Sequence, residues 1–211
     1  MVIIFDVDGT LIDTFPHVRA SYIHVLEKFF PGYQYTEEQL KSFFGPTLPD
    51  TFRTFTENEE FVRILVDKYV SHSRTIVRDY ISVFPDTIET LERLKEEGYP
   101  LAVLSNKRTQ VIKDQFSLLG ILDYFDLIIG YNDVKNPKPD PEGIRKIQSK
   151  LGKNCLFIGD TVYDIKTAKN AGVTSIGVLW ALASEADLRN AGADYIINDY
   201  QEFFEILRRL K

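Results

Sequence analysis

The sequence predicts an α/β protein, with a Rossmann-like parallel sheet as its core and an inserted α-helical cap domain. Short apolar runs alternate with helical segments after residue 83, a pattern typical of right-handed βαβ units with helices on both faces of a sheet. A first strand at residues 2–5 is separated from the next strand by about seventy residues of helical pattern, far more than a crossover needs. We therefore expect a core of residues 1–13 and 83–211 and a cap of residues 14–82.

Composition narrows the class of protein. Hydrophobic residues make up 44% and charged residues 27% of the 211 residues, which is ordinary for a soluble globular protein. The net charge is −6, and no stretch of the sequence is rich enough in basic residues to neutralise nucleic-acid phosphates. We therefore expect no nucleic-acid partner. No apolar run approaches the roughly 20 residues that span a bilayer, and the N-terminus enters a strand with no basic region before it, unlike a signal peptide. We expect no membrane partner and a cytoplasmic location, which the single cysteine, Cys155, also fits.

The segment from residue 11 to about residue 82 is predicted to be helical throughout. An amphipathic stretch at 17–30 is stopped by Pro31-Gly32, and Thr36 with Gln39 predicts a capping box for a helix that ends near residue 44. Helices are also expected at 48–55 and between 57 and 77. The aromatic residues of this segment recur at helical spacing and fit a cap core better than a substrate platform: Tyr22, Phe29, Phe30, Phe43, Phe44, Phe52 and Phe55.

From residue 83 the chain alternates between strands and helices. Asp140-Pro141 predicts a helix start, with Asp as the cap and Pro at the first helical position. The other expected elements are helices at 86–97, 109–119 and 199–210 and strands at 101–104, 127–129, 156–158, 175–179 and 195–197.

Two carboxylates, Asp6 and Asp8, follow the first strand where the chain leaves the core. In an open parallel sheet, ligands bind outside the carboxyl ends of the strands. Two nearby like charges repel, and a bound divalent cation such as Mg²⁺, which prefers carboxylate and carbonyl oxygens, relieves that repulsion. The same Asp-x-Asp-Gly-Thr pattern also suits a simple turn. Taken alone, this motif leaves both interpretations open.

Further polar residues follow later strands. Ser105-Asn106-Lys107 stands between a strand and a helix and suits an anion site at a helix N-terminus, although Ser105 could equally be a helix cap. Lys138 stands between two prolines, which hold it in an extended loop.

The last of these polar residues, Asp160 and Asp164, follow the strand at 156–158. Thr161 and Asp164 fit a capping box, which explains Asp164 but not Asp160. Together the strand-end residues supply carboxylates for a metal, a lysine, and hydroxyl and amide donors at one sheet edge. That inventory suits phosphoryl transfer, in which catalysis is mostly positioning and charge stabilisation.

These residues resemble the four ordered motifs of the haloacid dehalogenase-like hydrolase superfamily, and the match covers nearly the whole chain. The motifs are Asp6-Val7-Asp8-Gly9-Thr10, Ser105-Asn106, Lys138 and Gly159-Asp160 with Asp164. Within the superfamily the chain is most similar to the phosphoglycolate phosphatase group. Phe84-Pro85-Asp86 and the cap turn Gly45-Pro46-Thr47-Leu48 also resemble a bacterial inorganic pyrophosphatase of that group.

The resemblance implies a role for each matching residue. Asp6 is the expected nucleophile, forming an aspartyl-phosphate, and Asp8 the expected general acid and base. Mg²⁺ is expected to bind the Asp6 side chain, the Asp8 backbone carbonyl and Asp160, with Asp164 in support. Ser105 and Lys138 are the expected phosphate-binding residues, assisted by backbone amides near Asn106 and Gly9.

The expected function is a Mg²⁺-dependent phosphatase for a small phosphorylated metabolite, working as a monomer or homodimer. The first candidate substrate is 2-phosphoglycolate and the second is inorganic pyrophosphate. The cap turn at Gly45, Pro46 and Thr47 is a candidate specificity element because it can hang over the site. A phosphoacceptor signalling module without turnover is the alternative from another class. The cap lysines Lys28, Lys41 and Lys68 leave a phosphonate-cleaving enzyme open, whereas Asp8 argues against the dehalogenase branch.

Overall fold

The computed structural model describes residues 1–210 and confirms the predicted α/β class. Its central sheet is parallel and has six strands in the order β5-β4-β1-β6-β7-β8. Strand β1 lies between β4 and β6. The chain adds β4 and β5 on one side of β1 and then β6, β7 and β8 on the other side, so the strand order reverses at β1. Such a switch point is where open α/β sheets bind ligands. The strands are β1 (Val2–Phe5), β4 (Leu101–Leu104), β5 (Leu127–Ile129), β6 (Cys155–Gly159), β7 (Thr174–Val178) and β8 (Tyr195–Ile197).

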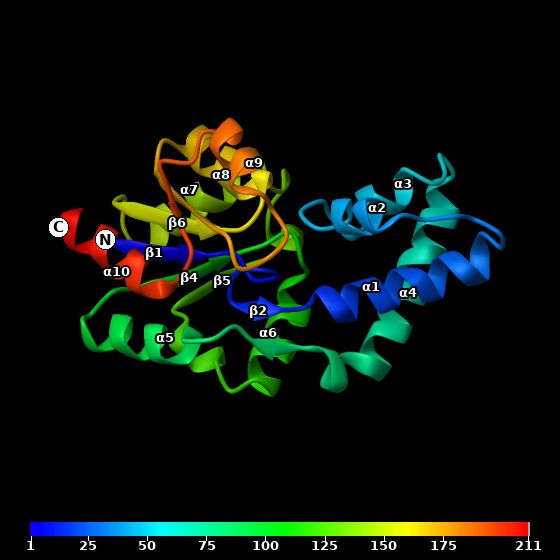
Figure 1. Cartoon of the computed structure of the whole chain (residues 1–211), viewed down its shortest axis with the longest axis horizontal. Helices are drawn as coiled ribbons and strands as arrows, with labels where there is room; N and C mark the ends of the chain where they lie inside the picture. The colour runs from blue at the N-terminus through cyan, green and yellow to red at the C-terminus, as the bar shows by residue number, and fades with distance from the viewer. Residues whose placement is uncertain (211) are drawn as a thin grey trace.

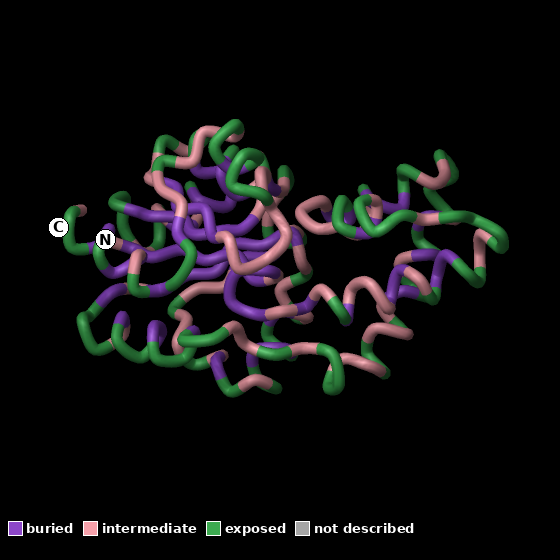
Figure 2. The backbone as a smooth tube through the Cα atoms, in the orientation of Figure 1, coloured by how far each residue is buried: buried purple, intermediate pink, exposed green. Residues whose placement is uncertain are grey.

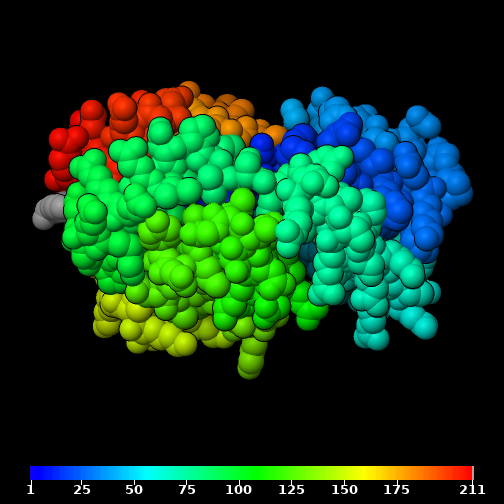
Figure 3. Space-filling view, turned by 90° about the horizontal axis from the view of Figure 1, so that it is seen from below, coloured from blue at the N-terminus to red at the C-terminus, as the bar shows by residue number. Residues whose placement is uncertain are grey.

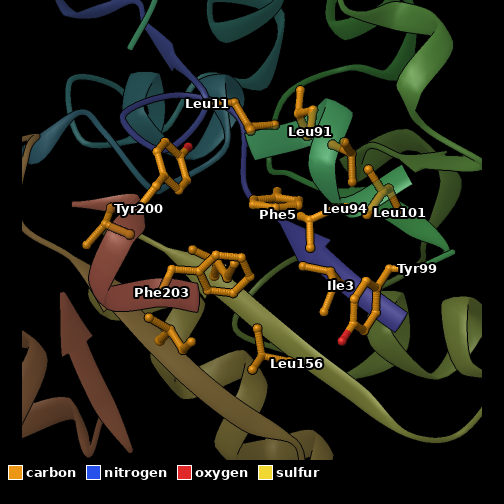
Figure 4. Close-up of a cluster of buried hydrophobic side chains, with 14 of the residues drawn as sticks. Ile3, Phe5, Leu11, Leu91, Leu94, Tyr99, Leu101, Leu156, Tyr200 and Phe203 are labelled. Atoms are coloured by element: carbon orange, nitrogen blue, oxygen red, sulfur yellow. The ribbon is translucent and has the colours of Figure 1, made fainter. Parts of the chain in front are cut away.

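Helices cover both faces of this sheet (Figure 1). Successive side chains of a strand point to opposite faces, so Ile3 and Phe5 join one buried cluster while Val2 and Ile4 join the other. This double burial explains why β1 is apolar at every position. The Phe5 side is covered by α5 (Thr87–Glu96), α6 (Thr109–Leu118) and α10 (Tyr200–Arg209), as Figure 4 shows in part. The opposite side is covered by α7 (Glu142–Leu151) and α8 (Val162–Ala171), with α9 (Glu185–Ala191) beside α8.

The helices between β1 and α5 in the chain project beyond the carboxyl ends of the strands and have a buried cluster of their own (Figures 1 and 2). They are α1 (Phe15–Phe29), α2 (Glu37–Ser42), α3 (Leu48–Arg53) and α4 (Glu59–Tyr80). The Tyr22 ring packs against Phe43 and Tyr69, with centroids 4.7 and 4.8 Å apart. Residues of this helical unit gather at one end of the molecule (Figure 3). The exact domain boundaries, at residues 14 and 82, stay a prediction.

The fold differs from the sequence expectation at the two chain crossings into the helical unit. β2 (Ile12–Asp13) pairs antiparallel with β3 (Ser82–Val83), where we expected helix throughout. Strands of two residues are too short to carry a hydrophobic period. Two 3₁₀ turns, Leu122–Tyr124 and Tyr131–Asp133, complete the core.

Two helix starts in the helical unit also differ from their predicted form. The Thr36 hydroxyl accepts from the Gln39 amide as expected, at 3.1 Å. The Gln39 side chain bonds to the Tyr33 hydroxyl instead of returning to Thr36, so the cap is single-sided. Helix α1 begins at Phe15, two residues earlier than predicted, and its N-cap Thr14 makes no capping side-chain bond.

Candidate active site

Three buried carboxylates meet where β1 and β6 end. Asp6 and Asp160 follow these neighbouring parallel strands, and the Asp6 amide donates to the Ile158 carbonyl at 2.9 Å. Asp164 lies in the first turn of α8, where it forms the predicted capping box with Thr161. Each of the three offers an oxygen within 4.8 Å of the others, and their exposed fractions are only 4%, 1% and 1%. The structure thus gathers three of the predicted site residues into one cluster.

Lys138 reaches into the same cluster from the loop between β5 and α7. Its Nζ lies 2.8 Å from Asp6 Oδ1 and 2.5 Å from Asp164 Oδ1. The Asn106 side chain holds this loop: its Oδ1 accepts from the Lys138 amide at 2.9 Å, and its Nδ2 donates to the Lys138 carbonyl at 3.1 Å. The side chain of Asn106 therefore positions Lys138, and any contact of residue 106 with phosphate falls to its backbone.

The cluster has more negative than positive charge. Burial, reinforced by the charge of Asp164, raises the pKa of Asp6 to about 7 although Lys138 opposes the shift. Burial, together with Asp164 and Asp6, also raises the pKa of Asp160 well above its usual range. For Lys138, burial disfavours the ammonium, but the charges of Asp164 and Asp6 outweigh burial and raise its pKa. One buried ammonium cannot neutralise three carboxylates, so the ionised cluster needs further positive charge.

The donor set fits a hard divalent cation. Asp160 Oδ1 accepts from the Thr10 hydroxyl at 3.0 Å, but Asp160 Oδ2 is buried and has no hydrogen-bond partner among residues 1–210. Buried carboxylate oxygens are normally satisfied by a donor or by a metal. Carboxylate oxygens are the ligands that Mg²⁺ and Ca²⁺ take in proteins. The unpartnered oxygen is therefore a natural ligand for such a cation.

Gly9 lets the loop after β1 pass against this carboxylate. Its φ is +80°, and a Cβ at this position would lie 2.2 Å from Asp160 Oδ2, so only glycine fits. The Gly9 amide donates to the Ile12 carbonyl at 2.9 Å. Its contact with phosphate stays a prediction.

Asp8 faces a separate pair of donors. The Thr14 hydroxyl donates to Asp8 Oδ1 at 2.5 Å, and Lys107 forms an ion pair with the same oxygen. Lys107 also donates to Gln115 Oε1 at 2.8 Å. The sequence predicts no role for Thr14, and for Lys107 only a place in the Ser105-Asn106-Lys107 anion site. Their signal in the sequence was position alone, since Lys107 follows a strand end and Thr14 stands one helical turn beyond the first motif.

Ser105 is buried directly after β4, and its hydroxyl accepts from the Lys107 amide at 3.3 Å. The interpretation of Ser105 as a helix cap is wrong, because α6 begins at Thr109 and its N-cap is Arg108. Ser105 instead borders the cavity that also contacts Asp6, Asp8 and Lys138.

This cavity, of about 180 Å³, lies between the strand ends and the helical unit. Gly45 and Pro46 line it, whereas Thr47 caps α3 by accepting from the Asp50 amide. The Gly45 carbonyl accepts from Asn106 Nδ2 at 2.7 Å, so the cap turn is bonded to the core. A Cβ at Gly45 would lie 2.6 Å from the Tyr163 ring, which leaves room only for glycine.

Two aromatic residues form hydrogen bonds with the backbone of the first motif. The Thr10 carbonyl accepts from Trp180 Nε1 at 3.1 Å and from the Tyr200 hydroxyl at 3.3 Å. Because Thr10 bonds to Asp160, these residues help to fix the carboxylate cluster. Nothing in the local sequence links residue 200 to residue 10.

Comparisons with known proteins agree with this geometry. A family model described as haloacid dehalogenase-like hydrolase matches residues 3–178. Pyrophosphatase PpaX of Bacillus velezensis is 33% identical over 207 residues, which cover 97% of this chain and 94% of that protein.

Solved structures give the same result. A predicted phosphatase from Clostridium acetobutylicum superposes with a TM-score of 0.88 at 29% identity, covering 99% of this chain and 98% of that one. A predicted phosphoglycolate phosphatase from Haemophilus somnus gives 0.85 at 25% identity, covering 98% and 97%. Within residues 1–210, no helix is both long and apolar enough to cross a membrane. The chain therefore belongs to the haloacid dehalogenase-like hydrolase family, and within it to the phosphatase-type enzymes.

Proposed function

We propose that the protein is a Mg²⁺-dependent phosphatase that hydrolyses a small phosphorylated metabolite through an aspartyl-phosphate on Asp6. The observation that carries this proposal is the buried cluster of Asp6, Asp160 and Asp164 around Lys138, beside a cavity, in which Asp160 Oδ2 has no hydrogen-bond partner among residues 1–210. A simple turn requires no such arrangement. The cavity also favours an enzyme over a phosphoacceptor signalling module, since it provides space for a leaving group next to Asp6.

The reaction has two displacements. An Asp6 carboxylate oxygen attacks phosphorus, and the bond from phosphorus to the leaving oxygen breaks as Asp8 gives that oxygen a proton. Asp8 then takes a proton from a water molecule, whose oxygen attacks phosphorus. The bond between phosphorus and the Asp6 oxygen breaks, which releases inorganic phosphate and restores the Asp6 carboxylate. Lys138 and Ser105 border the cavity and stabilise the negative charge of the phosphoryl oxygens.

Asp6 and Asp160 are the proposed side-chain ligands of Mg²⁺, with the Asp8 carbonyl as a third ligand and Asp164 in support. Bound there, Mg²⁺ supplies positive charge that the three carboxylates lack and that an anionic phosphate needs. Thr10 orients Asp160 through its hydroxyl. Lys138, which Asn106 and Asp164 hold in place, neutralises part of the negative charge of the carboxylate cluster.

Two substrates are tested first. For 2-phosphoglycolate, the support is a pair of arginines on the cavity, Arg74 and Arg108, which could meet its carboxylate. For pyrophosphate, the support is the similarity to pyrophosphatase PpaX along nearly the whole chain.

The experiment is phosphate release, with Mg²⁺ and with EDTA, from 2-phosphoglycolate, pyrophosphate, sugar phosphates, nucleotides and phosphonoacetaldehyde. We expect release that EDTA abolishes, with a kcat/KM above about 10⁴ M⁻¹s⁻¹ for a preferred substrate. Folded, Mg²⁺-loaded protein that releases no phosphate but keeps a stable acyl-phosphate would instead identify a phosphoacceptor.

A further inference from the structure

The two sides of the cavity differ in chemistry. Its core side holds the charged residues of the phosphoryl site. Its cap side is built mainly from apolar residues of α1, α4, the turn before α3 and the start of α3. Among the residues on that side are Val18, Phe44, Leu48, Val66, Val70 and Val77. A leaving group that extends from phosphorus toward the cap must therefore lie against hydrocarbon.

Few charges on this cavity are free for an anionic leaving group. Lys138 is paired with Asp6 and Asp164, and Lys107 with Asp8. Burial lowers the pKa of His17, although the hydrogen bond between its Nε2 and the Ser73 carbonyl, at 2.9 Å, opposes that shift. The lowered pKa disfavours the charged form of this cap residue. Arg74 and Arg108 remain, but both are exposed and so are hydrated in the absence of ligand.

Resting on the proposed function, we infer that the preferred substrate is a phosphate monoester whose leaving alcohol carries an apolar aliphatic or aromatic body. Placing a carboxylate or a second phosphate against the valines would remove its hydration without supplying a partner. A hydrocarbon body in the same place gains from leaving water. The cavity, about 180 Å³, is smaller than the roughly 300–1,000 Å³ that drug-sized ligands need, so the body is short.

A homologous series tests this inference directly. We would measure kcat/KM with Mg²⁺ for monoalkyl phosphates from methyl to hexyl phosphate and for phenyl phosphate, beside 2-phosphoglycolate and pyrophosphate. We expect kcat/KM to rise about fourfold for each methylene that leaves water and to level off when the cavity is full. The longer alkyl phosphates should exceed both anionic substrates.

Substitutions locate the effect on the cap wall. Val77→Thr and Val18→Thr keep the side-chain shape but add a hydroxyl to the wall. Both variants should flatten the rise along the series, with the largest losses for the longest alkyl phosphates. Ile64→Thr is the matched control, since Ile64 lies on α4 but is exposed and does not line the cavity. Its series should follow the wild-type curve.

The outcomes separate this inference from the proposed function. Mg²⁺-dependent hydrolysis in which pyrophosphate or 2-phosphoglycolate exceeds every alkyl and phenyl phosphate overturns the apolar leaving group but keeps the phosphatase. A rise along the series that Val77→Thr and Val18→Thr leave intact overturns the assignment to this wall. Absence of hydrolysis for every compound, from folded protein with Mg²⁺, overturns the proposed function itself.

Discussion

The core end and the cap end of the cavity differ in the side chains that line them and in how those side chains are positioned. At the core end, charged residues lie directly after strands whose parallel pairing fixes their separation, and they are almost completely buried. At the cap end, apolar side chains come from α1, α4 and a turn, which approach the core through few contacts such as the Asn106–Gly45 hydrogen bond. The two proposals assign a separate task to each end: phosphoryl chemistry to the core end and selection of the leaving group to the cap end. Each prediction below tests that division.

The largest effect is expected from Asp6→Asn. This change removes the proposed nucleophile and should lower kcat on the order of 10⁴- to 10⁶-fold, as loss of a catalytic nucleophile or its partners does elsewhere. Because the cap wall is untouched, substrate should still bind, as calorimetry with the preferred phosphate ester would measure. Wild-type turnover by the variant would refute the aspartyl-phosphate mechanism.

Asp8→Asn should have the second largest effect. Loss of general acid–base catalysis typically costs about 10²- to 10⁴-fold in rate, and kcat measured at several pH values would show it. Asp13→Asn is the matched control, since the Asp13 carboxylate accepts from the Phe15 amide at the start of α1, at 3.0 Å, and Asn caps helices equally well. Equal losses in the two variants would mean that Asp8 acts through loop structure rather than proton transfer.

Gly45→Ala tests the link between the two ends. The added methyl would overlap the Tyr163 ring and push the turn away from the core. A displacement of about 1 Å can lower the rate by up to about 100-fold. We therefore expect kcat/KM to decrease, by no more than about 100-fold. Gly32→Ala is the control, because Gly32 also has a positive φ of +85° but nothing within 4 Å of the added Cβ. Comparable losses of activity in both variants would assign the effect to backbone strain.

The smallest effect is expected on stability as a function of pH. In EDTA, the pKa of Asp6 in the folded protein is about 7, above the ordinary 3.8, so the folded state binds the proton more tightly. Its contribution to stability is fully present below pH 3.8 and is lost as pH rises through about 7. Urea midpoints of the wild type should therefore fall over this range relative to Asp6→Asn, and Mg²⁺ should remove the difference. Parallel midpoints in EDTA would contradict the shifted pKa.

Much of the core was predictable because its signals are local. The apolar run at β1 and the alternation of strands and helices after residue 83 predicted a parallel sheet, and parallel strands necessarily bring their carboxyl ends to one edge. Asp6, Asp160 and Asp164 could therefore be grouped before their positions were known. The β2–β3 pair could not be predicted, because two residues carry no periodicity and their pairing spans about seventy positions.

The sequence by itself determined the fold class and which residue types meet at the strand ends, since strand periodicity and motif order are written in neighbouring positions. Only the tertiary structure decided what surrounds them. In the folded protein the Asn106 side chain bonds to the Lys138 backbone, and Lys107 and Thr14 both contact the Asp8 carboxylate. Trp180 and Tyr200 donate hydrogen bonds to the Thr10 carbonyl. The apolar wall opposite Asp6 was likewise invisible in the sequence, where cap valines and aromatic residues look like core. Contacts of this kind depend on how separate elements pack, and no local pattern in the chain encodes that packing.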